Sequence, residues 1–248
     1  MTDDDRTAHF GDRVVPEADK SGLVRQVFDS VAQRYDLMND LMSGGVHRLW
    51  KNALMDHLAP RPGMHLLDVA GGTGDIAFRY RDRGGGRVTV CDVNEAMVGV
   101  GRDRALDAGR VEGIAWACGD AEALPVASGS VDAYTIAFGL RNVTRMDDAL
   151  REARRVLRPG GRFLCLEFSH VVLPLLDRLY DRYAEAVLPR LGRWVAGDAE
   201  AYRYLVESIR RFPEQETLAR HMARAGLDRP TWRNLTGGIA AIHTAWRL

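Results

Sequence analysis

A run of glycines after an apolar segment is the part of this sequence best suited to bind a ligand. Residues 66–75 read Leu-Leu-Asp-Val-Ala-Gly-Gly-Thr-Gly-Asp, so an expected strand passes through a glycine-rich turn into an expected helix. Glycine lets the backbone approach a ligand closely and adopt turns that side chains forbid. At the carboxyl end of a strand in a parallel sheet, such a turn predicts a nucleotide or nucleoside site, and the alternative is a tight turn that binds nothing. The residues expected to contact the ligand are Asp68, Gly71, Gly72, Thr73 and Gly74.

Two acids further along the chain favour a free nucleoside over a dinucleotide. Asp92 ends the second expected strand, where a carboxylate can accept both hydroxyls of a ribose. Asp120, followed by Ala121, comes after the third expected strand, where an acid can accept the exocyclic amine of adenine. A nicotinamide-dependent oxidoreductase remains the alternative, although it has no particular need for this second acid and its glycine fingerprint is matched only loosely. The combination predicts an S-adenosylmethionine site.

The elements that must position these residues follow an alternating pattern. Short apolar runs predict strands over 64–69, 87–91, 114–118, 131–137 and 162–168, and helical patterns between them cover 75–82, 95–108 and 146–157. Such alternation is typical of a parallel sheet covered by helices on both faces. The turn over 158–161 is expected to end a helix just before the fifth strand. Two further strands, 229–234 and 239–247, surround Thr236-Gly237-Gly238 and predict a C-terminal hairpin.

The regions outside this alternation are expected to be helical or irregular. The first twenty residues are polar and without period, which predicts a flexible N-terminal arm over 1–20. Helical spacing begins at Ser21, a second helix is expected over 46–58, and further helices over 173–191 and 213–226. We therefore divide the chain into the arm, a helical region over 21–62, and an α/β domain over 63–248.

Charge and composition exclude several classes of protein. The 248 residues include 34 Lys and Arg against 34 Asp and Glu, a balance that argues against nucleic-acid binding through bulk phosphate attraction. No segment approaches the run of about 20 apolar residues that a membrane-spanning helix needs, and the acidic start is unlike a secretory signal. Three widely spaced cysteines argue against a disulfide framework or a metal site, so we expect a cytoplasmic protein.

Longer segments outside the glycine turn carry a family resemblance. They are residues 35–43, which are followed by His47-Arg48-Leu49-Trp50, and residues 138–143, 155–161, 198–208 and 234–243. With them the chain resembles the class I methyltransferases and, more narrowly, the ubiquinone/menaquinone biosynthesis C-methyltransferases, from about Ser21 to the C-terminus. The resemblance implies an α/β, Rossmann-like class I methyltransferase fold. This fold has a seven-stranded, mostly parallel sheet with an antiparallel C-terminal hairpin, and here an N-terminal helical lid.

The resemblance also implies an activity and its partners. A methyl group would pass from S-adenosylmethionine to a ring carbon of a prenylated hydroquinone, either 2-polyprenyl-6-methoxy-1,4-benzoquinol, demethylmenaquinol or both. Methylation of another small aromatic compound is the alternative. The acceptor dissolves in membranes, so peripheral contact with the inner membrane face, a complex of quinone-biosynthesis enzymes and a homodimer are all compatible with this function. No nucleic-acid partner is expected.

Two residues after the fourth strand are the expected catalytic groups. A neutral aromatic carbon is a poor nucleophile, and ionisation of the neighbouring hydroxyl would activate it. Arg141 would stabilise the phenolate and Asn142 would orient a hydroxyl. Arginine is a poor proton acceptor because its pKa lies above about 12, so the base stays open. The alternative is that Arg141 pairs with a nearby carboxylate and ties the loop.

Four N-terminal residues are expected at the acceptor, namely Tyr35, Met38, Asn39 and His47. Either His47 or Tyr35 could be the base, although a lone histidine in an amphipathic helix is more often a packed residue. Ala137 stands where the family pattern has a small hydroxyl residue, so its expected contact with the cofactor is through the backbone.

Overall fold

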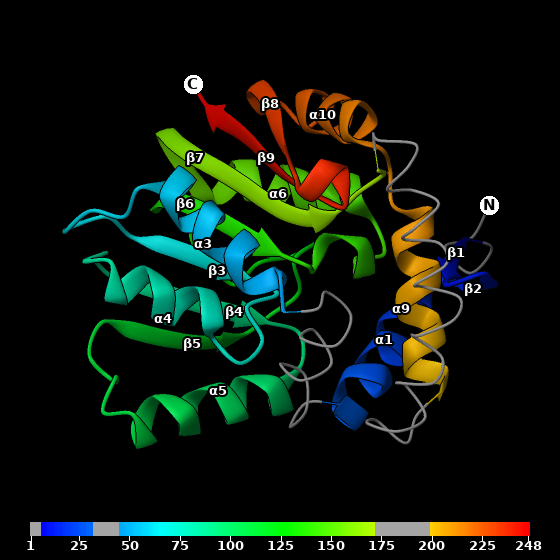
Figure 1. The fold of residues 1–248 in the computed structure, drawn as a ribbon, viewed down its shortest axis with the longest axis horizontal. Helices are drawn as coiled ribbons and strands as arrows, with labels where there is room; N and C mark the ends of the chain where they lie inside the picture. Colours follow the sequence, from blue (N-terminus) through cyan, green and yellow to red (C-terminus); the bar gives the residue numbers. More distant parts are fainter. Residues whose placement is uncertain (1–5, 32–44, 172–198) are drawn as a thin grey trace.

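A seven-stranded sheet forms the centre of the molecule in the computed structural model, which describes residues 6–31, 45–171 and 199–248 (Figure 1). The strand order is β5-β4-β3-β6-β7-β9-β8, in which β3 to β7 run parallel and β9 runs antiparallel to both neighbours. This confirms the predicted sheet and its antiparallel C-terminal hairpin. The strands are β3 (Leu66–Val69), β4 (Val88–Asp92), β5 (Ile114–Cys118), β6 (Val131–Ala137), β7 (Leu157–Phe168), β8 (Asp228–Leu235) and β9 (Ala240–Arg247).

Helices cover both faces of this sheet, as the apolar strands require. Successive side chains of a strand point to opposite faces, so Leu66 packs among residues of α3 (His47–Leu58) and α4 (Asp75–Asp82). Its neighbour Leu67 packs on the other face with α6 (Met146–Val156) and α10 (Gln215–Arg224). A further helix, α5 (Glu95–Asp107), packs along β4 and β5. Each fully buried leucine contributes roughly 1.5–3 kcal/mol to the stability of this arrangement.

The strand order places two loops side by side. β3 pairs with β4 on one side and with β6 on the other, so the chain changes direction across the sheet at β3. The turn after β3 and the short helix η3 (Leu140–Asn142) after β6 therefore leave the same edge. They are in close contact, because a Cβ added at Gly139 would lie 2.3 Å from the Cβ of Ala70. Ligands of open parallel sheets bind at this kind of switch point.

The N-terminal region differs from the irregular arm that the sequence predicted. Strands β1 (Thr7–Phe10) and β2 (Arg13–Pro16) form a hairpin, and α1 (Glu17–Val31) begins before Ser21. The hairpin and α1 lie beside α9 (Ala199–Arg211), a helix that the sequence did not predict (Figure 1). Phe10 and Val15 are buried against Val24 and Tyr204. Strands of four residues are too short to show a period, so only these distant partners reveal them.

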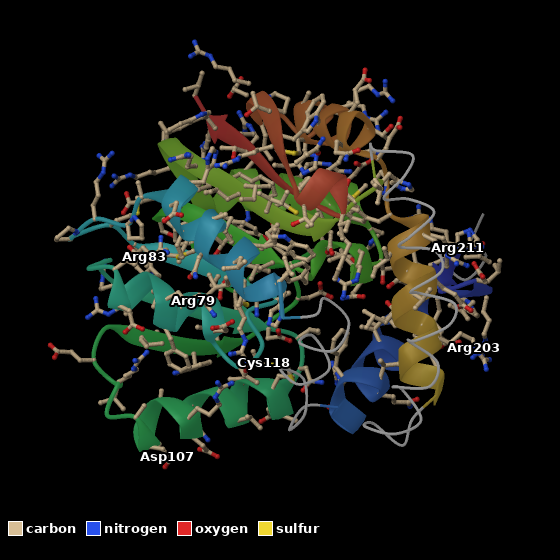
Figure 2. All side chains as sticks on the ribbon, viewed as in Figure 1. Arg79, Arg83, Asp107, Cys118, Arg203 and Arg211 are labelled. Atoms are coloured by element: carbon tan, nitrogen blue, oxygen red, sulfur yellow. The ribbon has the colours of Figure 1, made fainter. Side chains whose placement is uncertain are left out.

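Two further sequence predictions concern the turn over 158–161 and the helix over 173–191. The turn over 158–161 lies inside β7 as an irregularity opposite Val131–Ala133, where Gly160 adopts a φ of +79°. The predicted helix over 173–191 lies outside the described residues. Within the described residues, no helix is both long and apolar enough to cross a bilayer. The last turn of α9 is basic, with Arg210 and Arg211, and Figure 2 shows Arg203 and Arg211 projecting from this helix.

Candidate active site

The turn between β3 and α4 is shaped by close packing beneath it. A Cβ at Gly71 would lie 2.6 Å from Cγ1 of Val90 and 2.8 Å from Oδ2 of Asp68, so no larger residue fits there. Gly72 and Gly74 adopt φ values of +52° and +84°, which favour glycine. The turn therefore presents bare backbone to the space above it. This is the cradle that a closely bound ligand requires.

Asp92 joins this turn to the loop after β4. Its Oδ2 accepts a hydrogen bond from the Gly72 amide (2.8 Å), and its Oδ1 accepts one from the Asn94 amide (2.9 Å). Burial raises the pKa of Asp92, and these backbone amides oppose the rise. Each carboxylate oxygen can accept a second hydrogen bond, so the acid remains able to receive the two hydroxyls of a ribose.

The loop after β5 supplies the second predicted acid. Cys118 marks the end of this strand in Figure 2, and Asp120 follows it with its Oδ1 accepting from the Glu122 amide (2.9 Å). The Glu122 carboxylate in turn accepts from the amides of Thr144 (2.9 Å) and Arg145 (2.8 Å). The loops after β5 and β6 are thus bound to each other at the edge of the sheet.

These loops line a cavity at the carboxyl edge of the sheet, where open parallel sheets bind their ligands. The carboxyl ends of β3, β4, β5 and β6 form its floor, and α1 covers it with Val24, Arg25 and Phe28. Of the residues predicted from sequence, those that line it are Asp68, Gly71, Gly72, Thr73, Asp92, Asp120, Ala121, Ala137 and Asn142.

Three predicted site residues lie away from the lining of this cavity. Gly74 directly precedes α4, and a Cβ there would lie 2.5 Å from the Trp116 ring, so this glycine serves packing. His47 is buried at the start of α3, as expected for the packed alternative. The third, Arg141, is described below. Tyr35, Met38 and Asn39 lie outside the described residues.

Asp68 lies directly under the turn and is completely buried. Its Oδ1 accepts from the Thr135 hydroxyl (2.8 Å), whereas its Oδ2 has no hydrogen-bond partner within the described parts of the chain. Burial raises the pKa of Asp68 to about 7, against the opposing effects of Thr135 and Lys51. The carboxyl group therefore changes charge near neutral pH.

An ion pair that the sequence analysis missed also lines the cavity. Lys51 Nζ of α3 lies 2.7 Å from Oδ2 of Asp75, the first residue of α4. Burial alone would raise the pKa of Asp75, but Lys51 and Arg79 hold it below its ordinary value. A signal was present in the sequence, because Lys51 directly follows the quoted segment His47 to Trp50 and is one of two lysines in the chain.

Arg141 pairs with a carboxylate, which is the alternative that the sequence left open. Its guanidinium lies 2.7 Å from Oε1 of Glu167 on β7, and both side chains are 1% exposed. The guanidinium also donates to the carbonyl of Phe138, which closes the turn after β6. Burial raises the pKa of Glu167, and the positive charge of Arg141 opposes the rise. Arg141 thus organises the loop from behind, while its neighbour Asn142 lines the cavity.

Comparison with known families gives one match over most of the chain. Residues 15–247 match the family model described as the ubiE/COQ5 methyltransferase family. The chain is 61% identical to the ubiquinone/menaquinone biosynthesis C-methyltransferase UbiE of Paracoccus denitrificans, with 99% of each chain covered. It is 57% identical to the protein of the same name from Cereibacter sphaeroides, with 98% of this chain and 97% of the relative covered.

Solved structures share the fold at lower identity. The [4+2]-cyclase SpnF superposes with a TM-score of 0.66 at 20% identity, covering 90% of this chain and 95% of that one. Geranyl diphosphate C-methyltransferase from Streptomyces coelicolor superposes with a TM-score of 0.61 at 19% identity, covering 84% and 82%. At these identities the likeness shows the fold alone.

Proposed function

The chain belongs to the ubiE/COQ5 methyltransferase family, and on that premise we propose how its cavity binds two substrates and transfers a methyl group between them. The protein is an S-adenosylmethionine-dependent C-methyltransferase of ubiquinone/menaquinone biosynthesis, and its methyl acceptor is a quinol. The residues that perform each part are our proposal, supported by the contacts described above.

S-adenosylmethionine brings a methyl group bound to a positively charged sulfur, which makes that carbon electrophilic. Gly71, Gly72 and Thr73 would hold the cofactor through close backbone contact, and Asp92 would accept its ribose hydroxyls. Asp120 and Ala121, in the loop after β5, would hold the adenine. Ala137 has no side-chain hydrogen-bonding group, so its contact would be made by the backbone.

Lys51 and Asp75 would receive the methionine end of the cofactor. That end carries both a carboxylate and an ammonium group, and the Lys51–Asp75 pair lines the cavity with one charge of each sign. Charge-assisted hydrogen bonds of this kind are about twice as strong as neutral ones. The pair would therefore distinguish the complete cofactor from a nucleoside that lacks the amino acid.

At the other end of the cavity, Asn142 would orient the acceptor by donating to one of its ring oxygens. Arg141, because it is paired with Glu167, would act by fixing the turn that carries Asn142 rather than by contacting the phenolate. Tyr35, Met38 and Asn39 would add the lid contacts of the acceptor, with a flexible methionine suited to a prenyl chain. The role proposed for His47 is packing.

The finer identity of the acceptor and its surroundings also belongs to the proposal. Either prenylated quinol, 2-polyprenyl-6-methoxy-1,4-benzoquinol or demethylmenaquinol, has the activated ring that this chemistry needs. A prenyl tail partitions into membranes, so we propose peripheral membrane contact, tested by flotation of the protein with vesicles that contain the quinone. A homodimer or a larger biosynthetic complex would be detected by light scattering.

The observation that carries the proposal is the Gly72–Asp92 hydrogen bond of 2.8 Å, which brings the glycine turn and the ribose-type acid to one cavity. In the test, S-adenosylhomocysteine should raise the unfolding temperature, whereas NADH should leave it unchanged. Asp92→Ala should weaken S-adenosylhomocysteine binding roughly 10- to 100-fold, the effect of losing hydrogen bonds to a charged group. Exposed Asp103→Ala on α5 is the matched control.

The same preparation tests the methyl acceptor. Wild-type protein, S-adenosylmethionine and each reduced quinol should give a product heavier by one methylene group in mass spectra. Protection by NADH without protection by S-adenosylhomocysteine would support the oxidoreductase instead. Methylation of a simple phenol at the rate of both quinols would support the small-aromatic alternative.

A further inference from the structure

Tyr204 on α9 makes a contact that the proposed function does not use. Its hydroxyl lies 3.0 Å from Oδ1 of Asn142, a residue 62 positions away in the chain. The Tyr204 side chain is buried, with 3% of its surface exposed. It belongs to the segment 198–208 that the sequence singled out without a role. This phenol is therefore fixed against the one catalytic candidate that lines the cavity.

The hydrogen bond determines which end of the Asn142 amide remains available. An asparagine amide has one acceptor oxygen and one nitrogen with two hydrogens. Tyr204 donates to the oxygen, and Nδ2 lies 3.4 Å from the carbonyl of Phe138, a long hydrogen bond. The nitrogen therefore keeps a hydrogen for an oxygen atom in the cavity. A reversed amide would present an oxygen there, which could not donate to a phenolate.

The phenol itself is held by packing that does not involve its hydroxyl. The Tyr204 ring stacks on Phe10 of the N-terminal hairpin, with centroids 4.4 Å apart and planes 19° apart. Val15 and Val24 complete the cluster around it. Burial raises the pKa of Tyr204, so the hydroxyl keeps its proton and can donate throughout the neutral range. Ring position and hydroxyl function can thus be separated by mutation.

We propose that Tyr204 is a positioning residue for methyl transfer, whose hydroxyl orients the Asn142 amide so that Nδ2 donates to an oxygen of the quinol. This inference rests on the proposed role of Asn142. It assigns to α9 and the N-terminal hairpin a function at the acceptor end of the cavity. The effect passes through one hydrogen bond, since Tyr204 is not among the residues that line the cofactor cavity.

The test compares Tyr204→Phe with Phe10→Leu in the full chain. Tyr204→Phe keeps the ring on Phe10 and removes the hydroxyl, and we expect kcat for the quinol to fall about tenfold, as loss of one hydrogen bond predicts. Affinity for S-adenosylhomocysteine should stay within about twofold of the wild-type value, because no donor-end contact changes. Phe10→Leu loosens the packing of the ring but keeps the hydroxyl, so it should lower the unfolding temperature and reduce kcat less than Tyr204→Phe does. Equal loss of kcat in both variants would assign Tyr204 to packing and overturn the proposal.

A double-mutant cycle and a spectroscopic measurement complete the test. In an Asn142→Ala background, Tyr204→Phe should have no further effect on kcat, whereas additive effects would contradict the coupling. Labelling with [15N]asparagine gives five side-chain amides, and the Asn142 signal should shift in Tyr204→Phe without any ligand. If Asn142→Ala alone keeps wild-type turnover, the role of Asn142 in the proposed function fails and the inference falls with it. If Asn142→Ala loses turnover and Tyr204→Phe does not, the inference alone is wrong.

Discussion

The cavity has a donor end, where the glycine turn and Asp92 would hold the cofactor, and an acceptor end at Asn142. These two ends are built in different ways. At the donor end, the hydrogen bonds that fix Asp92 join residues close in the chain, namely Asp92 to Asn94, two apart, and Asp92 to Gly72, twenty apart. Asp68 is the exception there, because Thr135 of the paired strand holds it from 67 positions away. At the acceptor end, Asn142 is held by Tyr204 of α9 from 62 positions away, and Lys20 of α1 donates to the carbonyl of Val143 from 123 positions away (2.9 Å). The donor end is therefore built by the sheet and its own turns, and the acceptor end also needs helices that pack against it from outside the sheet.

This difference has a mechanical consequence. A local site keeps its shape as long as its strands and turns form, whereas an assembled site depends on every element that reaches it. Substitutions in distant elements such as α9 should therefore disturb the acceptor end. The same substitutions should leave cofactor binding at the donor end intact. The following variants test this contrast, beginning with the largest expected effect.

Removing Glu167 should give the greatest loss of stability. Glu167→Ala leaves the Arg141 charge buried without its partner, and breaking a buried ion pair costs about 3–5 kcal/mol. Chemical denaturation should show this loss in the free energy of unfolding. Glu167→Gln, which keeps the acceptor oxygen and the volume, should lose less. Equal stability of Glu167→Ala and wild type would mean that the pair does not support the acceptor end.

The pH dependence of stability should reveal Asp68 at the donor end. Because folding raises the pKa of Asp68 from 3.8 to about 7, the folded state favours the protonated acid. Its contribution is complete below pH 3.8, is lost as the pH rises to about 7, and does not change further above that. The loss is about 4 kcal/mol at most, from 1.36 kcal/mol per pKa unit.

Asp68→Asn should remove this dependence, so the variant should gain stability relative to wild type between about pH 4 and pH 7. The measurement is the free energy of unfolding at several pH values, with exposed Asp103→Asn as the control. Parallel curves for wild type and Asp68→Asn would contradict the prediction.

Adding a methyl group at Gly71 should damage the donor end alone. The new Cβ would meet Val90 and Asp68, and overpacking of this kind costs about 1–3 kcal/mol. Binding of S-adenosylhomocysteine, measured by calorimetry, should weaken at least tenfold. Gly99→Ala on α5, where a Cβ meets nothing within 4 Å, should bind normally. A quinol KM that rises as much as the cofactor KM would break the contrast between the two ends.

The smallest effect should come from Lys51→Met, which keeps an unbranched side chain one atom shorter and removes its charge. S-adenosylhomocysteine should bind about tenfold more weakly, equivalent to roughly 1.4 kcal/mol. Methylthioadenosine, which lacks the amino acid, should bind as it does to wild type. Equal losses for both ligands would show that Lys51 supports the cavity in general rather than the methionine end.

The same contrast explains how much could be predicted from the sequence. The strands, the glycine turn, Asp92 and Asp120 were predicted because each depends on neighbours within one strand–turn–helix unit. The N-terminal hairpin, α9 and the pairing of Arg141 with Glu167 in particular were not predicted, since their contacts join segments that only the fold brings together. For Arg141 the sequence allowed either stabilisation of the phenolate or pairing with a nearby carboxylate. The burial of its charge beside Glu167 supports the pairing.

The contact between Gly139 and Ala70 sets a limit on how this protein can be redesigned. The turn on the cofactor side and the turn on the quinol side touch without room for one added carbon, so neither can be enlarged alone. Libraries that seek new acceptor specificity should therefore keep positions 139 and 142 fixed and place their diversity at Val143 and Thr144, which also line the cavity. A larger residue at 139 would press on the cofactor-side turn at Ala70, so cofactor binding should be lost before any new acceptor could be tried.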